Sequence, residues 1–245
     1  MTFSPIKKKR IGERVAVALR ESILRGEFLP GDSLPSERDL AARFQVNRAS
    51  IREALTRLET LGLLQIRHGG ATRVRDFLTT AGLQLLPFLV APGGVPDLPL
   101  LKDLLDLRVA LLGWTARRAA QRLQDAPDLK LAGSFKKLQS LVKKMEQARS
   151  QPQKLKILDF DFFQTMVHMT QNRVLILVVN AIRQVYLSQP ELFDHLYQPG
   201  IFDTTRHRAT LRALDAGDKK KAAKAMEAYG KIAFDLLQPD AGRSE

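Results

Sequence analysis

The stretch from Leu34 to Val74 constrains the fold of this chain most, because its hydrophobic period changes along it. In its first part the apolar residues recur at helical spacing, and Ser36 and Asn47 stand where helix-capping residues are expected. In its second part apolar and polar residues alternate in two short runs, 64–67 and 72–75. The stretch therefore predicts two short capped helices followed by two strands.

Two neighbouring segments complete this pattern. Apolar residues also recur at helical spacing from Arg10 to Arg25, which predicts a helix before the capped pair. The segment His68 to Ala71 contains two glycines and can form the tip of a hairpin. Three helices followed by a hairpin predict a winged helix-turn-helix, in which the helix after Asn47 enters a DNA groove.

The beginning of that helix carries side chains suited to contacting base edges. Arg48 and Arg52 lie four residues apart and share a helix face, with Asn47 and Ser50 beside them. A bidentate arginine contact to guanine contributes roughly 1–3 kcal/mol of discrimination. Arg38, near the start of the preceding helix, could also reach the groove. The alternative is a solvated arginine face, but the order of helix, cap, turn and hairpin favours DNA.

The predicted hairpin supplies a second set of contacts. His68 and Gly69 at its tip can enter the minor groove, because glycine allows close approach of the backbone. Arg67, Thr72 and Arg73 on its flanks are then placed for phosphate contacts.

Composition agrees with a polyanionic partner. The 245 residues carry a net charge of +13, which favours binding to phosphates. The charge does not show which part binds, because residues 1–76 hold 15 Lys and Arg against 9 Asp and Glu, and the remainder 24 against 17. There is no cysteine, which excludes disulfides and thiolate metal sites.

No targeting or membrane segment is predicted. The N-terminus lacks the apolar region of a signal peptide. The most apolar run, Leu83 to Val95, is interrupted by Pro87 and Pro92 and is too short to span a bilayer. We therefore expect a cytoplasmic protein with no membrane partner.

The chain is predicted to be mainly α-helical, with two domains. Residues 1–76 form the winged helix-turn-helix, 77–98 a linker with a short helix, and 99–240 an all-helical domain. About six helices without strand-like alternation should pack as an antiparallel bundle. Trp114 is predicted to lie in the core of that bundle.

The run LPSERDLAARFQVNRASIREALTRLETLGLL, followed by RHGGATRV, resembles the DNA-binding domain of the GntR family of bacterial repressors. The resemblance covers about the first 75 residues. It implies a homodimer on a palindromic double-stranded DNA operator. The positions that it marks for the major groove are Arg38, Asn47, Arg48, Ala49, Ser50 and Arg52, and those for the minor groove are His68 and Gly69. Ala49 stands where relatives often have a hydroxyl residue.

The all-helical domain resembles the sensor domain of the FadR branch of this family. One sub-branch binds small carboxylates through a divalent metal, held by an Asp, a His four residues later, and two further histidines about 22 residues apart. Asp159 and His207 match this motif, but Phe163 and Tyr229 stand at the other two positions. Because a transition metal needs several converging N or O ligands, we predict no metal site and no cofactor.

The other sub-branch regulates fatty-acid metabolism and binds acyl-coenzyme A. HGGATRVRDFLTTAGLQLL resembles its wing-to-linker segment, and DFDFFQTMVHMTQN resembles its central helix. The resemblance predicts a long-chain acyl-coenzyme A as effector, with a small carboxylate as the alternative. The effector-binding positions that it marks are Arg108, Asp159, Asn180, Tyr186, His207, Tyr229 and Gly230.

The residues themselves support an effector pocket only in part. Arg108 lies between Leu107 and Val109 in an apolar helical stretch, where an unpaired charge is unusual. It either contacts a phosphate or carbonyl of a ligand or pairs with Asp159 as a buried structural bridge. Several large apolar residues either line a pocket or form the ordinary core of the bundle: Phe160, Phe162, Phe163, Met166 and Met169.

The sequence gives little support to an enzyme. It contains no nucleophile elbow, phosphate loop or zinc-ligand motif. Asp159 with His207 could form an acid–base pair, but a ligand pocket explains the same two residues. A third class, an architectural DNA-binding protein without an effector, would show no thermal shift with any ligand. We predict an effector-responsive transcriptional regulator.

Overall fold

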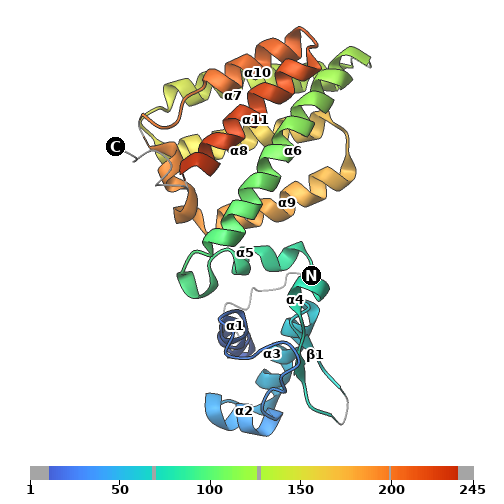
Figure 1. Ribbon diagram of the computed structural model, residues 1–245, viewed down its shortest axis with the longest axis vertical. Coiled ribbons are helices and arrows are strands. Elements are labelled where there is room, and N and C mark those ends of the chain that lie inside the picture. Colours follow the sequence, from blue (N-terminus) through green and yellow to red (C-terminus); the bar gives the residue numbers. More distant parts are fainter. Residues whose placement is uncertain (1–10, 68–69, 126–127, 199, 237–245) are drawn as a thin grey trace, which may run out of the picture. The chain divides into compact units, whose positions relative to one another are not determined.

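The computed structural model describes residues 11–67, 70–125, 128–198 and 200–236 (Figure 1). Its internal contacts divide the chain into two compact units, Met1–Val95 and Pro96–Glu245.

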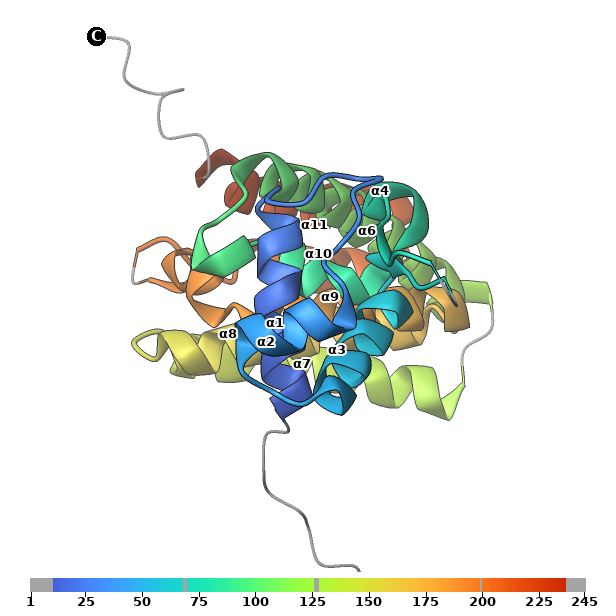
Figure 2. The same ribbon diagram turned by 90° about the horizontal axis from the view of Figure 1, so that it is seen from below.

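The first unit has the three helices that the sequence predicts (Figure 2) and the predicted hairpin (Figure 1). Its elements are α1 (Ile11–Leu24), α2 (Glu37–Phe44), α3 (Arg48–Thr60), β1 (Leu64–Gln65), β2 (Arg73–Val74), α4 (Phe77–Thr80), η1 (Leu83–Leu85), α5 (Leu86–Leu89) and η2 (Pro92–Gly94). The strands are antiparallel, with Leu64 opposite Val74 and Gln65 opposite Arg73. The prediction of a winged helix-turn-helix is confirmed.

The core of the first unit lies where α1 packs on α3. Leu19 on α1 and Ile51 and Leu58 on α3 are almost wholly buried. Burying each such side chain stabilises the unit by roughly 1.5–3 kcal/mol. This packing fixes α3 while its opposite face stays exposed.

Residues 77–95, most of the predicted linker, belong to the first unit. Leu85 and Val90 in this segment are fully buried. The Arg20 guanidinium of α1 lies 3.7 Å from the ring centroid of Phe88, a cation–π contact. The segment is therefore packed against α1.

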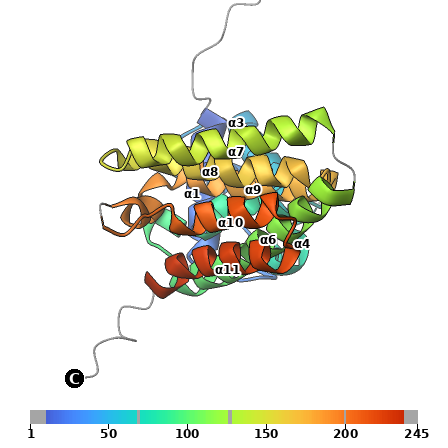
Figure 3. The ribbon, with the colours of Figure 1, turned by 90° about the horizontal axis from the view of Figure 1, so that it is seen from above.

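In the described part of the second unit every regular element is helical, which confirms the predicted all-α domain. Its elements are α6 (Leu98–Asp125), α7 (Leu129–Gln147), α8 (Pro152–Met169), α9 (Arg173–Ser188), η3 (Pro190–Tyr197), α10 (Thr205–Asp215) and α11 (Lys219–Leu236). Helix α11 packs along α6, α10 on α11, and α7 on α8. Figure 3 shows α7, α8, α10 and α11 as nearly parallel rods.

The prediction that Trp114 lies in the core is wrong, because this residue is 45% exposed. Helix α6 buries Leu112 and Ala116 instead. Two positions along a helix rotate a side chain by about 200°, so Trp114 cannot share the buried face of Leu112. No helix among the described residues is long and apolar enough to cross a membrane.

Candidate functional site

The N-terminus of α3 is built by a local cap. The side-chain oxygen of Asn47 accepts a hydrogen bond from the backbone N–H of Ser50 at 2.8 Å. This cap satisfies one of the unpaired donors at the start of the helix. In the turns that follow, the Arg48 and Arg52 side chains are 60% and 66% exposed.

A groove of about 1050 Å³ lies in the first unit and is lined by residues of α2, α3 and the hairpin. Its charged lining residues are Arg38, Arg48, Arg52, Arg67, Glu37 and Glu59. Thr72 also lines it. Four arginines around one groove suit the phosphates of a nucleic acid.

The remaining predicted contacts are placed differently. Ala49 is exposed on the first turn of α3. Arg73, predicted to contact phosphate, donates from Nη1 to the Gly31 carbonyl oxygen at 2.8 Å and so braces the base of the hairpin. His68 and Gly69 lie outside the described residues.

Glu37, for which no sequence pattern predicts a role in DNA binding, lies beside the two arginines of α3. The Nε–H of Arg52 is shared between the two carboxylate oxygens of Glu37, at 2.8 and 3.0 Å. Nη2 of Arg48 lies 3.7 Å from Oε2 of the same carboxylate. Glu37 and Arg52 are 15 residues apart, so local sequence patterns do not reveal the pair.

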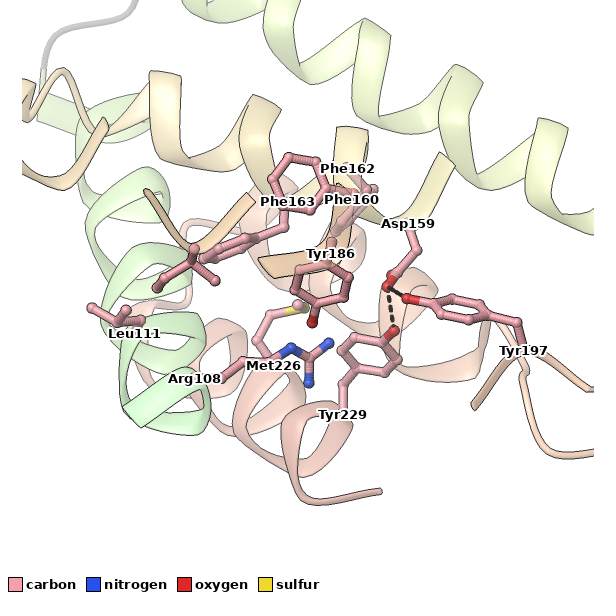
Figure 4. Close-up of a pocket in the computed structure, with 11 residues that line it drawn as sticks. Arg108, Leu111, Asp159, Phe160, Phe162, Phe163, Tyr186, Tyr197, Met226 and Tyr229 are labelled. Atoms are coloured by element: carbon pink, nitrogen blue, oxygen red, sulfur yellow. Dashed lines mark hydrogen bonds between the residues drawn. The ribbon is translucent and has the colours of Figure 1, made fainter. Parts of the chain in front are cut away.

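In the second unit a cavity of about 30 Å³ lies among α6, α8, α9, η3 and α11 (Figure 4). Its lining residues are Arg108, Leu111, Asp159, Phe160, Phe162, Phe163, Ile182, Tyr186, Tyr197, Met226 and Tyr229. Most of this lining is aromatic or aliphatic. A space of this size holds about one or two waters, so a larger ligand must displace side chains.

Asp159 is the centre of a buried hydrogen-bond network at this cavity (Figure 4). Its Oδ2 accepts hydrogen bonds from the hydroxyls of Tyr229 at 2.6 Å and Tyr197 at 2.8 Å. Its Oδ1 lies 2.8 Å from Nε2 of His207. Three elements that are distant in sequence therefore meet at one carboxylate.

The surroundings of this network shift the pKa of Asp159 and those of the two tyrosines in opposite directions. Burial raises the pKa of Asp159, but the hydrogen bond and charge of His207 outweigh it and hold that pKa below its usual value. Burial raises the pKa of Tyr197 and Tyr229 well above their usual value. At neutral pH the network is one carboxylate facing two phenol donors.

Arg108 supplies the cation at this cavity. Figure 4 shows its guanidinium between Tyr186 and Tyr229, and it lies 5.2 Å from the ring centroid of Tyr229. Its Nη1 is buried and, among the described residues, has no hydrogen-bond partner. Oδ1 of Asp159 contacts Nε2 of His207, and among the described residues Asp159 has neither a hydrogen bond nor an ion pair with Arg108. Of the two alternatives for Arg108, the structural bridge to Asp159 is therefore not the one observed.

Arg108 and Tyr229 also line a second cavity of about 20 Å³. The wall of this cavity includes Phe202 and Ile232. The two cavities therefore share the side chains of Arg108 and Tyr229 in their walls.

The donor set around Asp159 does not fit a divalent transition metal. It consists of one carboxylate, one imidazole and two phenols that burial keeps protonated. Phe163 lines the cavity without offering a donor atom. Within the described ranges, no three His, Cys, Asp or Glu residues converge as metal ligands do.

Comparison with protein families covers both units. Residues 11–74 match the model of the bacterial regulatory proteins of the gntR family, and residues 103–230 match the FCD domain. The chain belongs to the GntR family. It is a DNA-binding transcriptional regulator with an FCD domain, and not an enzyme.

Relatives of this GntR-family regulator include the uncharacterized HTH-type transcriptional regulator Rv0494 of Mycobacterium tuberculosis. It is 34% identical over 227 residues, which are 93% of this chain and 89% of the relative. The fatty acid metabolism regulator protein of Serratia proteamaculans is 29% identical over 166 residues, 68% of this chain and 65% of that protein. The predicted family is confirmed, but the chain is more similar to the mycobacterial regulator than to this fatty-acid regulator.

A solved structure has the same fold. It belongs to a study of Lar, described as controlling expression of the Listeria monocytogenes agr system and mediating virulence. It is 16% identical, has a TM-score of 0.59, and covers 95% of this chain and 99% of its own.

Three of the predicted effector positions of this GntR-family regulator lie outside the cavity lining: Asn180, His207 and Gly230. Asn180 is exposed on α9. Gly230 is buried where α11 packs on α6, and a Cβ there would lie 2.9 Å from Cγ2 of Val109. Gly230 therefore allows close packing of two helices.

The other predicted positions are brought together. Arg108, Asp159, Tyr186 and Tyr229 line the cavity, and His207 pairs with Asp159 behind it. Tyr197 was missed, because it lies at the end of the 3₁₀ segment η3, where no periodic pattern marks it.

Proposed function

We propose that this regulator binds a palindromic double-stranded DNA operator as a homodimer, and that an effector in the FCD-domain cavity sets its affinity for that operator. The proposed effector has an apolar body and an anionic or carbonyl group. The leading candidate is a long-chain acyl-coenzyme A, which would make the protein a regulator of fatty-acid metabolism genes.

The observation that carries this proposal is the buried, unpartnered Nη1 of Arg108. A buried donor without a partner costs about 1–3 kcal/mol, and a charged group costs more. A carboxylate, phosphate or thioester carbonyl would satisfy it. The aromatic walls formed by Phe160 and Phe163 would then contact the apolar part of the ligand.

The size of the cavity suggests how binding is signalled. A cavity of about 30 Å³ cannot hold an acyl chain unless aromatic side chains move. Such a movement would disturb the packing of α6, which carries Arg108 and begins three residues after Val95. Through this covalent connection the effector would bias the placement of the two DNA-binding units of a dimer.

On the DNA side, we propose that α3 enters the major groove. Arg48, Ser50 and Arg52 contact base edges, while Arg38 and Asn47 contact bases or phosphates nearby. Support comes from the exposure of both α3 arginines and from the groove beside them. Ala49 offers only a methyl group for apolar contact. His68 and Gly69 are proposed for the minor groove on the family resemblance alone.

A small carboxylate is the second candidate effector. The match to the FCD domain and the small cavity favour it. This ligand would also use Arg108 and would require less movement of the aromatic walls. The name of the Serratia relative favours the fatty-acyl candidate.

A thermal-shift screen on the full-length protein separates these candidates. The probes are butyryl-, octanoyl- and palmitoyl-coenzyme A, free coenzyme A, a set of small organic acids, and Zn²⁺, Ni²⁺ and Mn²⁺ salts. We expect palmitoyl-coenzyme A to raise the melting temperature and to weaken operator binding, and free coenzyme A to do neither. A shift with a small acid alone would support the second candidate. No shift with any probe would contradict an effector in this cavity.

A further inference from the structure

The contact between Glu37 and Arg52 joins the N-terminus of α2 to the helix proposed to enter the major groove. Only the Nε–H of Arg52 is engaged, and it is shared between both carboxylate oxygens. Among the described residues, neither Nη group of Arg52 has a hydrogen-bond partner. One edge of the guanidinium is thus held while its outer pair of N–H groups remains available.

This geometry suits recognition of guanine. Guanine presents two acceptors, O6 and N7, in the major groove, and a guanidinium meets them with two N–H groups in a fixed plane. A guanidinium held through Nε has lost much of its rotational freedom before DNA binds. An arginine whose rotamer is already ordered loses less side-chain entropy on binding.

Stability does not explain the pair. The Arg52 side chain is 66% exposed and that of Glu37 is 31% exposed. Exposed ion pairs contribute little to the free energy of unfolding, because water and salt screen them. A carboxylate in this groove also repels the phosphates of DNA, so its presence there calls for a role other than attraction of DNA.

We infer that Glu37 is a positioning residue for sequence readout, which holds Arg52 in the orientation that contacts a guanine. Its carboxylate also lies 3.7 Å from Nη2 of Arg48, so it places both recognition arginines relative to each other. This inference rests on the proposed entry of α3 into the major groove. Glu37 increases specificity and lowers the attraction of the groove for DNA of any sequence.

The experiment starts from an operator that the wild-type protein selects from randomised duplexes. Affinities for this operator and for a scrambled duplex are then measured by fluorescence anisotropy over a range of salt concentrations. The proteins are the wild type, Glu37→Gln, Arg52→Ala, the double variant, and Glu27→Gln as a control. Glu27 is a matched control, because it is an exposed glutamate paired with Arg25 at 2.8 Å outside the groove lining.

We expect Glu37→Gln to lower the ratio of operator to scrambled affinity about tenfold, the order expected when one bidentate contact is impaired. Its affinity for the scrambled duplex should stay the same or rise, since a negative charge is lost. In the Arg52→Ala background, replacing Glu37 should lower the ratio less than it does in the wild type, since only the contact with Arg48 is then lost. Glu27→Gln should match the wild type.

Two outcomes would overturn the inference. One is an unchanged ratio in Glu37→Gln, and the other is an equal loss with and without Arg52, which would show a general electrostatic effect. Wild-type protein that selects no sequence would instead contradict the proposed DNA contacts. Thermal melting checks folding, and Glu37→Asp, which keeps the carboxylate, is measured if Glu37→Gln melts at a lower temperature.

Discussion

The hydroxyl of Tyr229 donates a hydrogen bond to Oδ2 of Asp159 at 2.6 Å, which links α11 to α8 beside the cavity. The two residues are 70 positions apart in the chain. Tyr197 donates to the same oxygen, so this carboxylate ties η3 to the two helices. An effector bound next to these residues would disturb the hydrogen bonds of Asp159, which join α8, α11 and η3.

Replacing Tyr229 by Phe should lower the free energy of unfolding by about 1.5–3 kcal/mol, because it removes a hydrogen bond to a buried carboxylate. Urea unfolding measures the change. Tyr197→Phe should have a similar effect. The double variant should lose more than the sum of the two, because Oδ2 of Asp159 is then left unsatisfied. Simple additivity would show that the two hydroxyls act independently.

The stability of the domain should depend on pH at both ends of the scale. The pKa of Asp159 is lowered in the folded state, so its contribution is present above its unfolded pKa of about 4 and is lost as pH falls below that value. The pKa of Tyr197 and Tyr229 is raised, so their contribution is present below about pH 10 and is lost as pH rises above it. Urea unfolding across pH measures both.

Variants show which residues cause the loss of stability at acid pH (the acid limb of the pH profile) and at alkaline pH (the alkaline limb). Asp159→Asn should be less stable at neutral pH and should flatten the acid limb. The Tyr197→Phe, Tyr229→Phe double variant should flatten the alkaline limb. If Asp159→Asn loses stability at acid pH as much as the wild type does, the loss is caused by protonation of other carboxylates.

Replacing Gly230 by Ala should destabilise the second unit by about 1–3 kcal/mol. The new methyl group would lie 2.9 Å from Cγ2 of Val109 and 3.0 Å from Cδ1 of Leu112, which overpacks the contact between α11 and α6. Gly133 is a matched control, because a Cβ there has no atom within 4 Å. Gly133→Ala should stabilise α7 by about 0.5–1 kcal/mol. Equal effects at the two glycines in urea unfolding would contradict the packing role of Gly230.

Replacing Arg48 by Ala should abolish specific operator binding while leaving the melting temperature unchanged. Its side chain is 60% exposed and contributes little to the core. Electrophoretic mobility shift with the selected operator measures the effect. Arg25→Ala is the control, since Arg25 is an exposed arginine of the same unit outside the groove lining. Wild-type affinity in Arg48→Ala would contradict the proposed placement of α3.

Replacing Arg108 by Met should remove the response to effector without removing operator binding. Methionine keeps an apolar stem but lacks the Nη1 donor proposed to hold the ligand. The measurement is operator affinity with and without the ligand found in the thermal-shift screen. Arg117→Met, at an exposed position on α6, serves as control. A full ligand response in Arg108→Met would exclude this residue as the anchor.

The contrast between the local and the distant contacts explains what could be predicted. The caps of α2 and α3 act within three residues, from Ser36 to Asp39 and from Asn47 to Ser50. Such contacts, together with the change of period after Gly62, follow from neighbouring residues, and so the winged helix-turn-helix could be predicted. The role of the aromatic residues of α8 could not be predicted, because the same helical spacing suits a hydrophobic core and a ligand pocket. The prediction for Trp114 failed because a large apolar side chain on a helix does not by itself show which face of that helix is buried.

The sequence by itself determined the elements of this protein, the family, and the exposure of the α3 arginines. Only the tertiary structure decided which side chains meet. Asp159 pairs with residues 38, 48 and 70 positions away, and Glu37 with an arginine 15 positions away. The physical reason is that residues distant in the chain meet only where the helices that carry them pack together, and a buried charge such as Asp159 needs partners from those helices. That packing is set by the shapes of many side chains together and not by any local pattern.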